Sequence, residues 1–182
     1  MTLMPDKFRL DYELLEGAPF TWRSWFKVLS RGSMLMAYFG RVSEAPNLVG
    51  KIAHLFHLWM ARSRGCEITY SDKIQGGLAF AHAYAITVNV GVRTGQNVIL
   101  YKGCTLGGIR SGVRRGVPIL GSHVVIGLNA TVCGGVTIGD DVFIAPGAFV
   151  NFDVPDHSVV VGNPGVIHAK EGATRDYFRD VR

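Results

Sequence analysis

The sequence predicts a mainly β protein, a parallel β-helix preceded by a short α-helical segment. The first observation is a run of aliphatic residues spaced six apart, each followed four positions later by a small or aliphatic residue. The run comprises Leu120, Ile126, Val132, Ile138, Ile144 and Val150, with the companions Val124, Ala130, Val136, Val142, Ala148 and Val154. A helix repeats its apolar residues every 3.6 positions and a strand every second one, so neither explains a strict six. Hexapeptide repeats explain it, because three of them form one coil of a parallel β-helix.

The second observation is that the same period extends upstream and is interrupted once. The spacing of six holds for Ile68, Ile74, Phe80 and Ile86. The register then slips by two residues, and the spacing of six resumes at Thr94, Leu100 and Leu106. A polar loop at residues 107–117 then separates Leu106 from Pro118. Such a loop has no part in stacking coils, and loops of repeat folds are common binding sites. Its arginines are therefore either ligands for an anion or solvated side chains: Arg110, Arg114 and Arg115.

The third observation is that residues 1–65 predict helices instead of repeats. Segments 21–39 and 46–64 carry helical periodicity, and Pro46 suits the first turn of the second helix. In one interpretation these helices pack on the β-helix or on each other. In the other they form a basic amphipathic surface that contacts the inner face of a membrane. We expect the β-helix to occupy residues 66–170 and a tail with one or two helical turns to occupy residues 171–182.

Composition limits the class of protein. Hydrophobic residues make up 48% of the chain and charged residues only 18%, which indicates apolar surface hidden in an oligomer. The net charge of +5 favours an anionic partner, but no aromatic-rich basic strip accompanies it, so nucleic acid is not expected. The three cysteines have no paired spacing, which favours reduced thiols. Without a signal peptide or an apolar run of membrane-spanning length, the expected location is the cytoplasm.

One histidine lies within an apolar and small-residue stretch. His82 follows the inward-facing Phe80 by two residues, which places it near a corner and pointing outward. Imidazole at such a position can accept a hydroxyl proton as a general base. Glu67 precedes it by fifteen residues, so the two can lie on neighbouring coils and form a hydrogen bond that orients the ring. The alternative is that His82 is a structural residue.

Residues from Gly65 to Lys170 resemble the hexapeptide-repeat acyltransferases, most closely the serine acetyltransferase branch. The match is carried by 65–68 with His82, the turn at 104–108, and 154–164. The resemblance implies a left-handed β-helix, acetyl-CoA as co-substrate, no metal, and a homotrimer with active sites between subunits. It implies His82 as the base and Glu67 in place of an orienting aspartate. It also implies cofactor contacts from Gly108, Leu128, Pro146 and Lys170. We further predict that backbone N–H groups near the Gly107–Gly108 turn hold the thioester oxygen.

The departures concern the acceptor. Where the serine enzymes have Asp before the histidine, this chain has Ala81, and where they have Arg-His before the proline, it has Gly116 and Val117. These groups grip an amino acid, and only Arg115 is placed to replace one of them. Together with the short helical segment, this pattern resembles the acetyltransferases of capsule, exopolysaccharide and lipopolysaccharide gene clusters. We therefore expect a saccharide acceptor, with free L-serine as the alternative.

Two other classes of function stay open. A metal-dependent hydratase on the same fold would need three histidines that converge between subunits, and the repeats offer His82, His123 and His157 without the close pair expected. His54 and His57, three apart on a predicted helix, would form half a metal site, but no third ligand is evident and a structural role is favoured. A non-catalytic scaffold is the last possibility, because fold alone does not confer activity.

Overall fold

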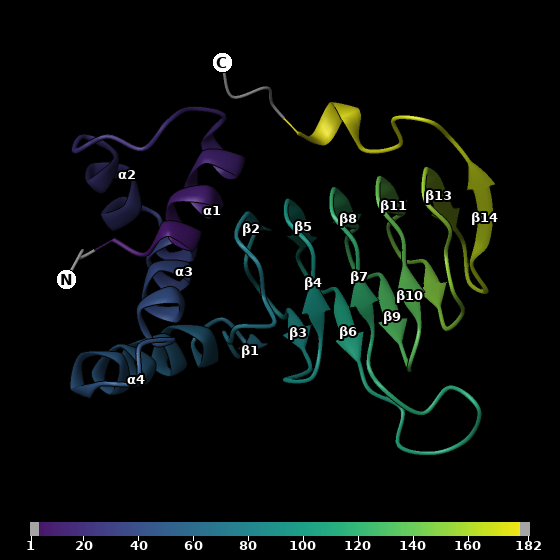
Figure 1. The fold of residues 1–182 in the computed structure, drawn as a ribbon, viewed down its shortest axis with the longest axis horizontal. Helices are drawn as coiled ribbons and strands as arrows, with labels where there is room; N and C mark the ends of the chain where they lie inside the picture. The colour runs from purple at the N-terminus through teal and green to yellow at the C-terminus, as the bar shows by residue number, and fades with distance from the viewer. Residues whose placement is uncertain (1–3, 179–182) are drawn as a thin grey trace.

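The chain forms a helical end followed by a three-sided β-helix (Figure 1). The computed structural model describes residues 4–178, so the ends of the predicted helical segment and tail, 1–3 and 179–182, lie outside the described residues. The helices are α1 (Asp6–Glu16), α2 (Ser24–Ser30), α3 (Gly32–Val42) and α4 (Leu48–Arg62).

Three sheets of short strands form the sides of the β-helix. Sheet A contains β1 (Glu67–Ile68), β3 (Thr87–Val88), β6 (Thr105–Gly107), β9 (Thr131–Cys133) and β12 (Phe149–Val150). Sheet B contains β4 (Arg93–Thr94), β7 (Ile119–Leu120) and β10 (Thr137–Ile138). Sheet C contains β2 (Leu78–Ala81), β5 (Val98–Tyr101), β8 (Val124–Ile126), β11 (Val142–Ile144) and β13 (Ser158–Val161), all parallel, and ends on the antiparallel β14 (Val166–Ala169).

The predicted six-residue ladder is confirmed. Phe80, Leu100, Ile126 and Ile144 stack in register through sheet C, and their side chains are buried in the core of the β-helix. The slip by two residues has a local cause, because the corner between β2 and β3 is two residues longer than the next corner of its kind. As a result Val88, and not Ile86, stacks on Ile68 in sheet A. His82 lies in this enlarged corner.

The helical segment differs from the prediction in two ways. The expected helix over 21–39 is two helices, because Arg31 between them has extended backbone angles, φ −109° and ψ 103°. Helix α1 was not predicted. The second expected helix is α4, and its N-cap is Asn47, whose side-chain oxygen accepts a hydrogen bond from the Gly50 amide at 2.9 Å.

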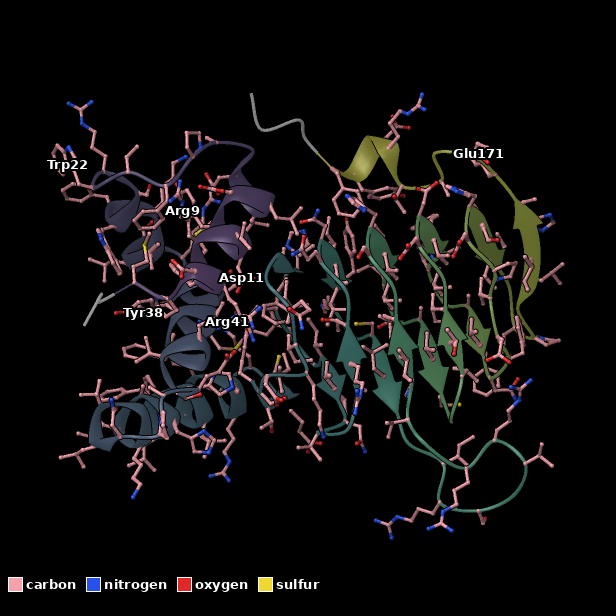
Figure 2. The ribbon with its side chains drawn as sticks, viewed as in Figure 1. Arg9, Asp11, Trp22, Tyr38, Arg41 and Glu171 are labelled. Atoms are coloured by element: carbon pink, nitrogen blue, oxygen red, sulfur yellow. The ribbon has the colours of Figure 1, made fainter. Side chains whose placement is uncertain are left out.

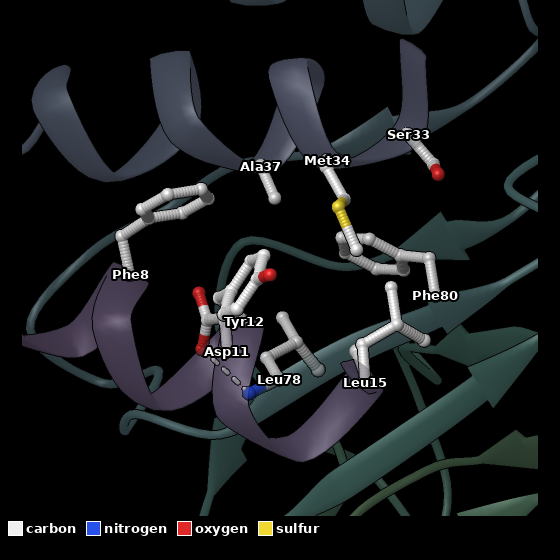
Figure 3. A pocket seen from close by; sticks show the side chains of 10 residues that line it. Phe8, Asp11, Tyr12, Leu15, Ser33, Met34, Ala37, Leu78 and Phe80 are labelled. Carbon is white, nitrogen blue, oxygen red and sulfur yellow. Dashed lines mark hydrogen bonds between the residues drawn. The ribbon is translucent and has the colours of Figure 1, made fainter. Parts of the chain in front are cut away.

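A buried ion pair joins the helices to the first coil (Figure 2). Arg41 of α3 donates to both carboxylate oxygens of Asp11 of α1, at 2.8 and 3.0 Å, and its side chain is 0% exposed. Arg41 also donates to the carbonyl oxygens of Ile74 and Gln75, and Asp11 accepts the Leu78 amide at 2.7 Å (Figure 3). Burial raises the pKa of Asp11, and the Arg41 guanidinium opposes that rise. The cavity beside the pair has a volume of about 10 Å³, too small for a ligand.

His57 is structural, as favoured by the sequence. It is buried in α4, with Nδ1 3.1 Å from the Met36 carbonyl oxygen and Nε2 2.8 Å from that of Ile68. Both ring nitrogens therefore contact backbone oxygens, and the side chain ties α4 to α3 and β1. Within residues 4–178 no three His, Cys, Asp or Glu side chains gather as a metal site would require, and no helix is long and apolar enough to cross a membrane.

The C-terminal segment is held against sheet C by Asp141. After β14 the chain turns back (Figure 1), and the Asp141 carboxylate accepts hydrogen bonds from the amides of Ala173 and Thr174, the Thr174 hydroxyl and the His157 ring. The 3₁₀ turn Arg175–Tyr177 then stacks Tyr177 on Phe143, with ring centroids 4.8 Å apart. The predicted helical tail is thus one turn within the described residues.

We expect this attachment to depend on pH from both sides. Burial works to raise the pKa of Asp141, but hydrogen bonds from His157 and Thr174 outweigh it and hold the pKa well below 3.8. The ionised Asp141 carboxylate therefore contributes to folding stability above pH 3.8. This contribution is lost as pH falls through the folded-state pKa of Asp141, which is lower. The hydrogen bond to Asp141 raises the pKa of His157 above 6.5. Protonated His157 therefore contributes to folding stability below pH 6.5, and this contribution is lost as pH rises through the higher folded-state pKa of His157.

Trypsin cleavage after Arg175 at one fixed pH measures the attachment. We expect Asp141→Asn to be cleaved several-fold faster than the parent protein. Asp153→Asn is the matched control, because that carboxylate accepts the Thr137 amide and pairs with Arg114 but does not contact the tail. Equal cleavage of all three proteins would contradict the role given to Asp141. Across pH, the difference in urea midpoint between parent and Asp141→Asn is expected to be greatest between pH 3.8 and 6.5.

Candidate active site

A groove with a volume of about 550 Å³ runs across sheet A beside the helical end. Leu58 and Arg62 of α4 line one side of it, and Gly107 and Gly108 line the other, where the chain leaves β6 for the loop. Its floor is formed by residues of β1, β3 and the turn after β3: Glu67, Ile68, Thr69, Thr87, Val88, Asn89 and Val90. Three of the predicted site residues, Glu67, Gly107 and Gly108, thus line a single groove. Arg62, Thr69 and Asn89 were not predicted, because no repeat position or motif marks them.

Glu67 and His82 lie on neighbouring segments, as predicted. The Glu67 amide donates to the Ile86 carbonyl oxygen at 2.9 Å, and the Ala85 amide donates to that of Arg64, also at 2.9 Å. These bonds hold the corner that contains His82 against the residues that lead into β1. Both side chains are exposed, and in the described part of the chain neither makes a hydrogen bond, so the expected carboxylate–imidazole bond is not formed. His82 has a φ of +58°, a left-handed conformation that is uncommon for residues other than glycine and that His123 and His157 also adopt.

The corner of His82 continues along one edge of the β-helix. The Gly103 amide donates to Tyr84, the Asn129 amide to Lys102, and the Gly147 amide to Leu128. Corners 82–85, 102–103, 128–129 and 146–147 therefore stack along the edge between sheets C and A. Leu128 and Pro146, both exposed, lie on this edge with His82. We define it as the His82 edge.

The remaining predicted cofactor residues lie on other edges of the same chain. Gly107 and Gly108 are at the opposite side of sheet A, where the loop begins. Lys170 is exposed, and its amide donates to His157 at 2.7 Å on the edge between sheets B and C. Within one chain, Gly108 therefore lies across the width of sheet A from the His82 edge, and Lys170 lies across the width of sheet C from it.

The loop at 107–117 is attached to the coils at its base and along one side. Ile109 and Gly116 exchange two backbone hydrogen bonds of 2.9 Å, and the Gly135 amide donates to Arg114 at 2.9 Å. A Cβ on Gly135 would lie 2.8 Å from the Arg115 carbonyl oxygen, so only glycine allows this close approach. The sequence did not identify this contact between Gly135 and the loop, because glycine is frequent throughout the repeats. Arg115 is exposed on the loop.

Gly116 has a backbone conformation that excludes most side chains. Its φ is +138°, and a Cβ there would lie 2.9 Å from the Gly135 Cα. An arginine at position 116 would therefore require a different path for the loop. Ala81, the other departure, ends β2 half-buried, paired with Tyr101 and next to the outer apolar cluster of sheet C.

The cysteines and the other histidines have structural surroundings. Burial raises the pKa of Cys104 to about 12, and it raises the pKa of Cys66 as well. Neither thiol is thus prepared to act as a nucleophile. His123 contacts Asn97 at 3.1 Å and His157 bonds to Asp141, both on the edge between sheets B and C and away from His82. The three histidines of a hydratase site do not converge within one chain.

Comparison with known proteins identifies the repeats. Residues 118–151 match the family model described as bacterial transferase hexapeptide (six repeats). The chain carries hexapeptide-transferase repeats. The resemblance predicted from the sequence is confirmed by similarity to curated serine acetyltransferases. One from Helicobacter pylori is 37% identical over 99 residues, which cover 54% of this chain and 58% of the relative. One from Synechococcus elongatus is 31% identical over 141 residues, which cover 76% of this chain and 54% of the relative.

Solved structures agree. The serine acetyltransferase of Neisseria gonorrhoeae aligns with a TM-score of 0.74 and 25% identity, covering 90% of this chain and 64% of that chain. The same enzyme in complex with serine aligns with a TM-score of 0.67 and 26% identity, covering 90% and 67%. The hexapeptide-repeat chain spans little more than half the length of the curated relatives given above.

Proposed function

We propose that the protein is an acetyl-CoA-dependent O-acetyltransferase with a left-handed β-helix, and that L-serine is its first candidate acceptor. The similarity to serine acetyltransferases, with Glu67 and the Gly107–Gly108 turn in one groove, supports this assignment. We predicted a saccharide acceptor first and serine second, and the relatives favour the reverse order. The cytoplasmic location stays a prediction.

The proposed reaction is a direct transfer of the acetyl group. His82 removes the proton of the acceptor hydroxyl, and the hydroxyl oxygen attacks the thioester carbonyl carbon. The C–S bond then breaks, and the coenzyme leaves as a thiolate that takes the proton from the imidazolium. Glu67 stabilises the positive charge on the ring once the acceptor has drawn the two together. The Gly107 and Gly108 backbone borders the groove where the thioester oxygen would gain negative charge.

The residues present suit acetyl-CoA. Its phosphates need a cation, and Lys170 is an exposed cation. Its pantetheine arm needs backbone groups beside small or apolar side chains, which Gly108, Leu128 and Pro146 provide. These residues lie on separate edges of one chain, however, so one copy cannot line a continuous cofactor groove. We therefore propose the homotrimer that the resemblance implies, in which the His82 edge of one copy faces another edge of its neighbour.

A saccharide acceptor is the second candidate, and the backbone at Gly116 favours it. The serine enzymes place an arginine at the matching position, and the φ of +138° here does not accommodate one. Ala81 likewise offers no charge for an ammonium group. A neutral sugar hydroxyl would need neither side chain.

Release of coenzyme thiol from acetyl-CoA separates the two acceptors. With L-serine at millimolar concentration we expect turnover, and we expect Arg115→Ala to raise KM for serine at least tenfold, because a carboxylate loses its charged partner. Arg110→Ala, on the same loop, is the matched control and should leave KM within about twofold. Turnover with a saccharide and none with L-serine would move the assignment to the second candidate. If the protein released no thiol with either acceptor and did not bind coenzyme A, the proposal that it is an acetyltransferase would be wrong.

A further inference from the structure

Helix α4 has a second apolar face that the described chain leaves largely exposed, although the Phe56 ring on it stacks on Phe39. Its buried face packs on α3 and β1 through Gly50, Ala53, His57, Met60 and Ala61. On the opposite side, large apolar residues recur at intervals of three and four and are between 48% and 72% exposed. We call this surface the α4 face: Leu48, Ile52, Leu55, Phe56 and Trp59. Figure 1 shows α4 along the lower border of the helical end, with its C-terminal end running toward β1.

The charge around this face has one sign. Residues 17–66 contain seven lysines and arginines and a single acidic residue, a net charge of +6, whereas the whole chain carries +5. All the net positive charge of the protein therefore belongs to the segment that includes α2, α3 and α4. Within this segment Glu44 is paired with Lys7 and Arg41, and three of the seven cations are paired with acids outside it: Lys27 and Arg31 with Glu16, and Arg41 with Asp11. Lys51 adjoins the α4 face and has no ion pair within residues 4–178.

We propose that the α4 face binds the surface of an anionic lipid bilayer. Six large apolar side chains of this 15-residue helix are exposed, the five of the α4 face and Val49, and basic residues lie at its margin. Such a helix can lie along the headgroup region, with Trp59 near the boundary between headgroups and acyl chains. The acyl region takes up the apolar side chains, and lipid phosphates neutralise the basic ones. No residue of the α4 face lines the groove on sheet A, so this proposal does not rest on the proposed acetyl transfer.

A second copy of the chain fits the same face less well. Antiparallel pairing of two α4 helices about a two-fold axis would bring Lys51 of one toward the C-terminal end of the other, which carries Arg62 and is followed by Arg64. No acidic residue occurs between positions 45 and 66 to offset these charges. Like charges brought together in an interface weaken it, whereas an anionic bilayer supplies the opposite charge.

Vesicle co-sedimentation of the full-length protein tests the proposal. We expect binding to phosphatidylcholine vesicles that contain about one-third phosphatidylserine, weak binding to pure phosphatidylcholine, and loss of binding at high salt. Lys51→Glu should weaken binding to the anionic vesicles about tenfold at low salt. Replacing both Leu55 and Trp59 by Glu should weaken it at least tenfold, because both side chains would lose their apolar surroundings.

Val166→Glu is the matched control, an exposed valine on β14 at the far end of the β-helix from α4 (Figure 1). It should bind vesicles as the parent does, and the unfolding temperatures of all variants should stay close to the parent value, because the substituted residues are exposed. Binding that is equal on neutral and anionic vesicles, or that survives the double substitution, would overturn the proposal. A third result would also overturn it: no vesicle binding, together with a molecular mass that rises with protein concentration in the parent but not in the double variant. That result would assign the α4 face to a second copy of the chain.

Discussion

Replacing His82 by Asn is expected to lower kcat by roughly 10²- to 10⁴-fold, the usual contribution of a general base. Asparagine suits the test because it tolerates the positive φ of +58° and forms no cation near neutral pH. KM for acetyl-CoA should change little, because the imidazole acts on the proton of the acceptor. The measurement is steady-state thiol release with the acceptor that the parent protein uses.

His168→Asn is the matched control for this variant. His168 lies exposed on β14, at the end of the β-helix opposite the helices, and should keep kcat within about twofold. Glu67→Gln should lower kcat without removing the base, since a neutral amide cannot stabilise the imidazolium. A His82→Asn protein that kept most of its kcat would return His82 to a structural role and remove the basis for the proposed mechanism.

Replacing Asp11 by Ala is expected to lower the free energy of unfolding by about 3–5 kcal/mol, because it leaves the buried Arg41 without its counter-charge. In a chain of this size that corresponds to a fall in Tm of roughly 10 °C. Thermal unfolding followed by circular dichroism measures it. The loss has a specific structural origin, since the pair links α1 and α3 to the backbone between β1 and β2 and to the start of β2.

Two further variants separate the ion pair from its surroundings. Asp6→Ala removes an exposed carboxylate from the first turn of the same helix and should cost less than about 1 kcal/mol. The double variant Asp11→Leu with Arg41→Met should regain much of the stability lost by Asp11→Ala, since a well-packed apolar pair often replaces a buried ion pair. A single variant as stable as the parent would show that the pair does not hold the helices to the first coil.

The sequence alone determined the β-helix and its repeating register. Stacked coils require the same side-chain type at the same position in every coil. A period of six therefore predicts the sheets, the core positions and the boundaries of the repeats together. That is why residues such as Ile126 and Ile144 could be placed in the core from spacing. It is also why the slip before Thr94 and the loop at 107–117 were visible as breaks in the period.

The tertiary structure decided what depends on contacts between distant residues. The break between α2 and α3 and the pairing of Asp11 with Arg41 have no periodic signature. The groove on sheet A forms only because α4 packs beside β1, and the separation of the predicted cofactor residues onto three edges follows from the corner to which each coil brings them. The conformation of Gly116 likewise comes from its close approach to Gly135. Periodicity records what is repeated along the chain, whereas a site is built from the residues that depart from the repeat, and only folding brings those together.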